Sequence, residues 1–91
     1  IPYIDLDDKQ LEAEYKRLMN EGTPEDLIQI IRTTYMRNQK RIEKNKKTSD
    51  KDSRYFEQAE TYLYYEIATV MNISFDEAKE YVFQKVHNEV S

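Results

Sequence analysis

The fold is decided by the stretch from Ser49 to Met71, which reads SDKDSRYFEQAETYLYYEIATVM. Ser49 is a good helix N-cap, and apolar side chains recur after it with helical spacing. The main apolar face comprises Phe56, Ala59, Leu63, Ile67 and Val70, and apolar character continues around the helix through Tyr62, Tyr64, Tyr65 and Ala68. A helix that is apolar on nearly every side belongs in the middle of a bundle. We therefore expect a central helix from about Asp50 to Met71.

Two helices are predicted before this segment. The first runs from about Lys9 to Asn20, with Asp7 or Asp8 as its N-cap and Gly22 at its end. The second begins at the Thr23 cap and Pro24, and it reaches about Lys44. Buried positions are expected at Leu11, Tyr15 and Leu18 in the first helix, and at Leu27, Ile31, Tyr35 and Ile42 in the second, where Thr34 and Asn38 interrupt the apolar stripe.

A fourth helix is predicted after Met71. The sequence Ser74-Phe75-Asp76-Glu77 has the S-x-x-E form of a capping box, which marks a helix start. Its buried side is expected at Phe75, Ala78, Val82, Val86 and Val90.

Composition limits the fold class and the compartment. The 91 residues include one Gly and two Pro, too few turn formers for a chain of many short strands. We predict an all-α protein, a compact bundle of four main helices forming a single domain over residues 1–91. There is no Cys, which suits the cytoplasm, and no apolar run approaches the roughly 20 residues of a membrane span. The chain begins with Ile-Pro, so we expect it to be part of a longer protein.

The residues needed for catalysis or metal binding are largely missing. There is no Cys nucleophile, and His87 is the only histidine, close to the end of the chain where a surface position is expected. Two acidic groups, Asp5-Asp7-Asp8 and Asp50-Asp52, fail as calcium loops because a basic residue occupies the next alternate position. One Gly cannot form a glycine-rich phosphate cradle. We expect no enzyme activity, no cofactor and no metal.

Positive charge is concentrated in one quarter of the chain. Nine of the 14 Lys and Arg lie between Arg32 and Arg54, against three of the 18 acids, although the whole chain carries a net charge of −4. Part of this charge follows the spacing i, i+3, i+4, i+7 and so forms one stripe of the second helix, which we expect to point to solvent. The stripe consists of Arg37, Lys40, Arg41 and Lys44. The charge continues through the turn onto the third helix. The candidate DNA-binding residues are Arg37, Lys40, Arg41, Lys44, Lys46, Lys47, Lys51 and Arg54.

Most charge runs are merely solvated faces, and Lys44 suits a helix C-terminus through the helix dipole. That interpretation does not explain Lys51 and Arg54, because positive charge is unfavourable at a helix start unless an anion binds there. Tyr64 and Tyr65 are candidates for stacking on bases, but in a central helix aromatic residues usually pack against other helices, which is the role we expect.

The sequence also resembles a known family. Residues Ile30 to Arg41 (IIRTTYMRNQKR), the basic turn with Ser49 to Tyr55 (SDKDSRY), and the later segments EQAE, EIA and NISFDEA are similar, in order and spacing, to the helical C-terminal domain of CarD-type (CdnL) bacterial transcription regulators. The resemblance covers roughly Leu11 to Val82, nearly the whole chain.

This resemblance implies a function. Family members contact promoter DNA through this domain and help to stabilise the open complex, while an N-terminal Tudor-like domain, absent from this chain, binds RNA polymerase. Arg37 to Arg54 would be the DNA-facing set, with Arg54 the best-matched residue. The chain departs from the family in having no Trp before the first helix, and Tyr3 is not expected to replace it as a minor-groove wedge.

Two functions therefore remain open from the sequence. The first is sequence-independent binding of promoter DNA by a monomeric, RNA-polymerase-associated regulator. The alternative is a helical protein-interaction module whose basic hairpin binds an acidic partner surface.

Overall fold

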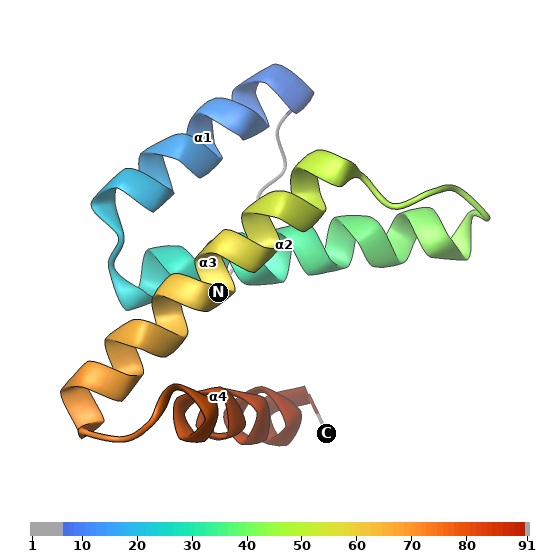
Figure 1. Cartoon of the computed structure of the whole chain (residues 1–91). Helices are drawn as coiled ribbons and strands as arrows, with labels where there is room; N and C mark the ends of the chain where they lie inside the picture. Colours follow the sequence, from blue (N-terminus) through green and yellow to red (C-terminus); the bar gives the residue numbers. More distant parts are fainter. Residues whose placement is uncertain (1–6, 91) are drawn as a thin grey trace.

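The computed structural model describes residues 7–90, with side chains for residues 7–85. In this part of the chain there are four helices and no strand: α1 (Asp8–Glu21), α2 (Pro24–Glu43), α3 (Asp50–Met71) and α4 (Phe75–Val90). The expected all-α bundle is confirmed. α3 runs back diagonally across α2, and α1 and α4 lie on opposite sides of this pair (Figure 1). No helix within the described residues is long and apolar enough to cross a membrane.

The predicted helix starts are confirmed by side-chain caps. Asp7, rather than Asp8, caps α1 by accepting a hydrogen bond from the Gln10 amide at 2.9 Å. Thr23 and Ser49 cap α2 and α3 in the same way. The Ser74–Glu77 capping box is complete, because each residue's side-chain oxygen accepts from the other's backbone N–H at 3.0 Å. Gly22, at φ 64°, ends α1 in the left-handed conformation that glycine adopts without strain.

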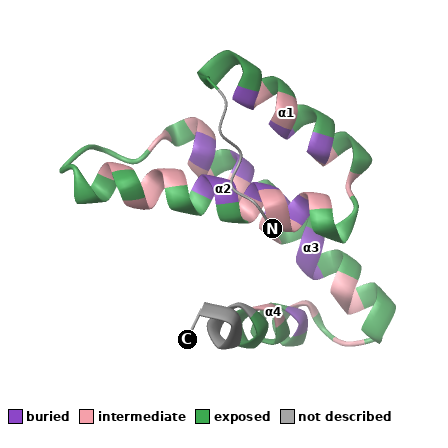
Figure 2. Cartoon of the chain, turned by 180° about the vertical axis from the view of Figure 1, so that it is seen from behind, coloured by how far each residue is buried: buried purple, intermediate pink, exposed green. Residues whose placement is uncertain are grey.

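The hydrophobic core lies between α1, α2 and α3, where the inner faces of these helices are buried (Figure 2). Tyr15 and Tyr55 pack in its centre with ring centroids 5.0 Å apart. α4 lies against the second half of α3, where Ala78 is fully buried and the Phe75 ring meets Tyr64 edge-on. The eight buried core residues are Leu11, Tyr15, Leu18, Leu27, Ile30, Tyr55, Ala59 and Leu63.

The predicted buried stripe of α2 is correct at Leu27, correct in part at Ile31 and wrong at Tyr35 and Ile42. Ile31 is partly buried and packs against the core, while Tyr35 and Ile42 are 55% and 52% exposed. The buried face instead comprises Leu27, Ile30, Thr33 and Thr34. The apolar pattern did not identify the buried face of α2, because the second half of α2 packs against the polar start of α3. Thr34 tolerates burial because its hydroxyl donates to the Ile30 carbonyl at 2.8 Å.

The predicted face of α3 is correct only in part. Ala59 and Leu63 are buried and Phe56 and Ile67 are partly buried, but Val70 is 74% exposed. Tyr55 and Tyr64 complete the buried set instead, together with one carboxylate, Asp52. The expectation that α3 is buried on nearly every side is also wrong, since Tyr62 and Tyr65 are exposed.

On α4, Ala78 is buried as expected, and Phe75 and Val82 are partly buried. The side chains of Val86, His87 and Val90 lie outside the described residues, as do Tyr3 and Asp5.

Candidate nucleic-acid interface

A fully buried carboxylate, Asp52, lies beneath the basic hairpin. It is the third residue of α3, and its backbone N–H donates to the Ser49 cap. Its side chain accepts a hydrogen bond from the Tyr15 hydroxyl at 2.9 Å and from Nε of Arg37 at 3.0 Å. Asp52 therefore joins α1, α2 and α3 through partners 37 and 15 residues away in the sequence. Burying an ionised carboxylate is tolerated only with such partners.

Arg37 is consequently not the solvent-facing cation that its place in the stripe predicted. Its side chain is only 16% exposed, and its second contact is an ion pair with Asp8 at 3.1 Å. On the helical wheel Arg37 lies between the buried positions Ile30 and Thr33, so it belongs to the face of α2 that α3 covers. Arg37 is thus a structural residue at the base of the hairpin.

Asn38 fixes the loop that follows. Its side-chain oxygen accepts from the Ser49 N–H at 2.8 Å, and its amide nitrogen donates to the Ser53 hydroxyl at 3.2 Å. Ser49 would otherwise leave its N–H exposed at the start of α3. The end of α2 and the start of α3 are therefore held together by polar side chains.

The turn after α2 folds Lys46 back over the helix. Asn45 adopts the left-handed conformation at φ 58°, and the N–H of Lys46 donates to the Arg41 carbonyl at 2.8 Å while the N–H of Asn45 donates to the Ile42 carbonyl at 3.0 Å. This is a Schellman motif, with Asn in the position that Gly usually occupies. The sequence suggested only a polar turn from Lys46 to Thr48.

Lys46 therefore joins basic residues of α2 around one surface hollow. A surface hollow of about 200 Å³ is lined by no carboxylate, and its lining residues are Arg37, Lys40, Arg41, Lys44 and Lys46. We call this the basic hollow. Lys40, Lys44 and Lys46 are exposed, and Arg41 is partly buried. The arrangement concentrates positive charge at one point, where it attracts an anion such as a phosphate group.

The remaining three candidate residues lie outside the basic hollow. Lys47 is exposed in the turn. Lys51 is partly buried in the first turn of α3, and its Nζ lies 3.4 Å from the carbonyl oxygen of Asp8. Arg54 is the fifth residue of α3, one beyond the first turn where it was expected, and its guanidinium lies 5.8 Å from the centroid of the Tyr55 ring.

Of the two candidate stacking residues, Tyr64 is buried against Phe75, which confirms the packing role. Tyr65 also contacts Phe75, at a centroid distance of 4.9 Å, but it is 60% exposed. Among the described residues, no group of three or more His, Asp or Glu side chains is placed to hold a metal ion.

The sequence did not predict the buried structural role of Asp52, which was a candidate only as a calcium ligand. The one local signal was the S-x-x-D spacing of Ser49 and Asp52, which resembles a capping box. The contacts with Tyr15 and Arg37 have no local signal, because they depend on how the helices cross.

Comparison with known proteins adds no assignment. No known protein family, curated protein or solved structure gives a significant match to this chain.

Proposed function

We propose that this chain binds the phosphate backbone of duplex DNA through the basic hollow and the adjoining hairpin residues. The observation that supports this proposal most directly is that Lys40, Arg41, Lys44 and Lys46 line one hollow with no lining carboxylate, where the fifth lining residue, Arg37, is already paired with Asp52. Phosphate contacts carry no base information, so binding is largely independent of sequence.

The resemblance to CarD-type regulators extends the proposal. On that basis the DNA is promoter DNA near the melted region, and the chain helps to stabilise the open complex. Contact with RNA polymerase then belongs to a separate N-terminal domain. Within the candidate set, the exposed residues Lys40, Lys44, Lys46 and Lys47 make the primary phosphate contacts, and Arg37 supports them from below.

The test compares two triple variants with the same change in net charge. Lys40→Gln, Lys44→Gln and Lys46→Gln remove cations from the basic hollow, while Lys9→Gln, Lys16→Gln and Lys79→Gln remove exposed cations elsewhere. Arg37 is kept in both because its loss would disturb Asp52. Binding to a short duplex is followed by fluorescence anisotropy across a salt series, with unchanged circular dichroism as the folding control.

The unmodified chain should bind with a Kd of about 10⁻⁴ to 10⁻⁶ M. Counterion release predicts that the hollow variant lowers the slope of log K against log salt by about 0.9 for each phosphate that it no longer neutralises, and that the control variant leaves the slope nearly unchanged. Equal reductions in both variants would show that only net charge matters and would contradict the proposal. Stronger binding to an oligoglutamate peptide than to DNA would favour the alternative, an acidic protein partner.

A further inference from the structure

A second hollow, of about 330 Å³, lies between the α1–α2 turn and the second half of α3. Leu27, which is buried, forms its floor beside Gly22. On α3 it is lined by Tyr62, Tyr65, Glu66 and Thr69. We call this the acidic hollow, because Glu66 is the one charged residue of its lining.

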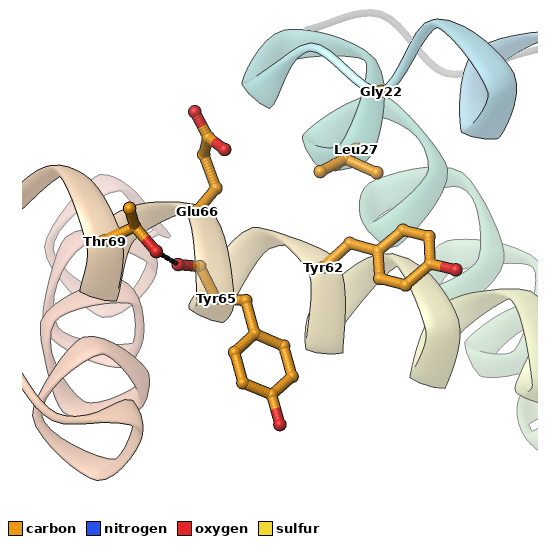
Figure 3. Close-up of a pocket in the computed structure, with 6 residues that line it drawn as sticks. All are labelled: Gly22, Leu27, Tyr62, Tyr65, Glu66 and Thr69. Atoms are coloured by element: carbon orange, nitrogen blue, oxygen red, sulfur yellow. Dashed lines mark hydrogen bonds between the residues drawn. The ribbon is translucent and has the colours of Figure 1, made fainter.

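The side chains of α3 that line the acidic hollow project from different sides of the helix (Figure 3). Glu66 lies on the side of α3 toward Gly22 and Leu27, and the ring of Tyr65 lies on the opposite side, near Phe75. The Thr69 hydroxyl donates to the Tyr65 carbonyl at 2.9 Å. The groups left to meet a ligand are the Glu66 carboxylate and the Tyr62 ring, which is 54% exposed.

The lining of this hollow carries negative charge only, because Glu66 is its one charged residue. The lining residues belong to segments 18–31 and 55–78, which together contain eight Asp and Glu and no Lys or Arg, and the neighbouring Arg17 is paired with Glu14 and Glu21. No Lys or Arg among the described residues forms an ion pair with Glu66. A phosphate-bearing ligand is therefore repelled, and a cationic one is attracted.

A lysine or arginine side chain complements this hollow, because it carries a positive charge at the end of an aliphatic stem. Its aliphatic stem can lie against the exposed Tyr62 side chain while its charged head reaches the Glu66 carboxylate. The exposed face of Tyr62 offers a cation–π contact to the same head group. We propose that the acidic hollow binds a lysine- or arginine-bearing segment of a partner protein.

The position of the acidic hollow allows this partner and an anion to bind together. It is lined by Gly22 and Leu27, by the start of α2, while the residues that line the basic hollow lie at the end of that helix and in the turn after it. A helix of 20 residues is about 30 Å long, so the two sites do not overlap. The proposal does not depend on DNA binding.

The basic hairpin of a second copy is another possible occupant. That contact joins two different surfaces, so unless it is made twice about a two-fold axis it builds rings or open chains. We favour a different protein as the partner, and self-association is the outcome that would contradict this choice.

The experiment is an NMR titration of the full chain with the end-blocked peptide GSRKRSG, and with GSQQQSG as the uncharged control. Amide shifts should change at Gly22, Leu27, Tyr62 and Glu66 with the basic peptide only. Glu66→Lys should weaken binding about fivefold to tenfold, because an exposed attraction is replaced by repulsion. The matched reversal Glu57→Lys, on the same helix but outside the hollow, should change the affinity by less than about twofold.

Equal effects of the two reversals, or equal binding of the two peptides, would overturn the proposal. Sedimentation of the unmodified chain tests the second-copy alternative. Self-association that disappears in both Glu66→Lys and Lys47→Glu would assign the hollow to another copy of this chain and would also overturn the proposal. Circular dichroism confirms that each variant remains folded.

Discussion

At the scale of the residue, Asp52 has the most consequences for both stability and charge. It neutralises Arg37 inside the hairpin and fixes the position of that guanidinium beneath the basic hollow. Buried ion pairs give little net stability compared with apolar packing, but removing one partner leaves the other without compensation. This asymmetry makes the network testable.

We predict that Asp52→Ala lowers the free energy of unfolding by about 3 kcal/mol, since Arg37 loses its inner partner and the Tyr15 hydroxyl loses this acceptor. The control is Asp50→Ala, an exposed carboxylate two residues away, which should cost less than about 1 kcal/mol. Urea denaturation measures both. A cost for Asp52→Ala as small as that of the control would mean that the carboxylate is not buried with these partners.

At the scale of the element, local capping fixes where helices begin. The start of α4 depends on the reciprocal bonds between Ser74 and Glu77. Hydrogen bonding from the Ser74 backbone N–H, and to a lesser extent from its side chain, favours the ionised carboxylate and lowers the pKa of Glu77 from its ordinary value. α4 has few other anchors, because Ala78 is its only fully buried residue among those with described side chains.

The lowered pKa of Glu77 predicts a pH dependence for α4. A carboxyl group with a lower pKa in the folded state stabilises it above the unfolded pKa, and this contribution is lost as the pH falls through the folded pKa. Glu77→Gln should therefore reduce the protection of the first-turn amides of α4 at neutral pH, and this difference should shrink as the pH falls below the ordinary glutamate pKa of about 4.3 and through the lower folded pKa. Hydrogen exchange followed by NMR measures this protection. A difference between the two proteins that persists unchanged in acid would refute an electrostatic role for Glu77.

At the scale of the whole molecule, the charges are segregated. The basic hairpin joins the end of α2 to the start of α3. The opposite ends of these two helices, with the adjoining parts of α1 and α4, belong to segments 18–31 and 55–78, which contain no Lys or Arg. The core between α1, α2 and α3 holds these two regions in a fixed relation. The stability of that core depends on one face of α3.

We predict that Leu63→Ala lowers the free energy of unfolding by about 2–5 kcal/mol, because Leu63 is 2% exposed and its truncation leaves a cavity. Val70→Ala on the same helix should change it by less than about 0.5 kcal/mol, since Val70 is 74% exposed. Thermal or urea unfolding of the two variants provides the comparison. The assigned buried face of α3 is wrong if Val70→Ala proves the more destabilising change.

Much of the architecture was predictable from the sequence alone. Asp7, Thr23, Ser49 and Ser74 mark helix starts by bonding to an amide three residues later. These contacts lie within one turn, so they follow from local sequence whatever the helices pack against. The concentration of basic residues between Arg32 and Arg54 is likewise a property of the sequence.

The tertiary structure decided which side chains face inward and which remain available. Ile42 is exposed while Thr34 and Asp52 are buried, because the second half of α2 packs against the polar start of α3. The same crossing takes Arg37 out of the solvent-facing stripe, and the turn at Asn45 brings Lys46 into the basic hollow. The sequence alone therefore determined the helices and where the charge is concentrated. The packing of helices distant in sequence determined which of those charges can meet a ligand, because burial and pairing depend on neighbours that periodicity does not identify.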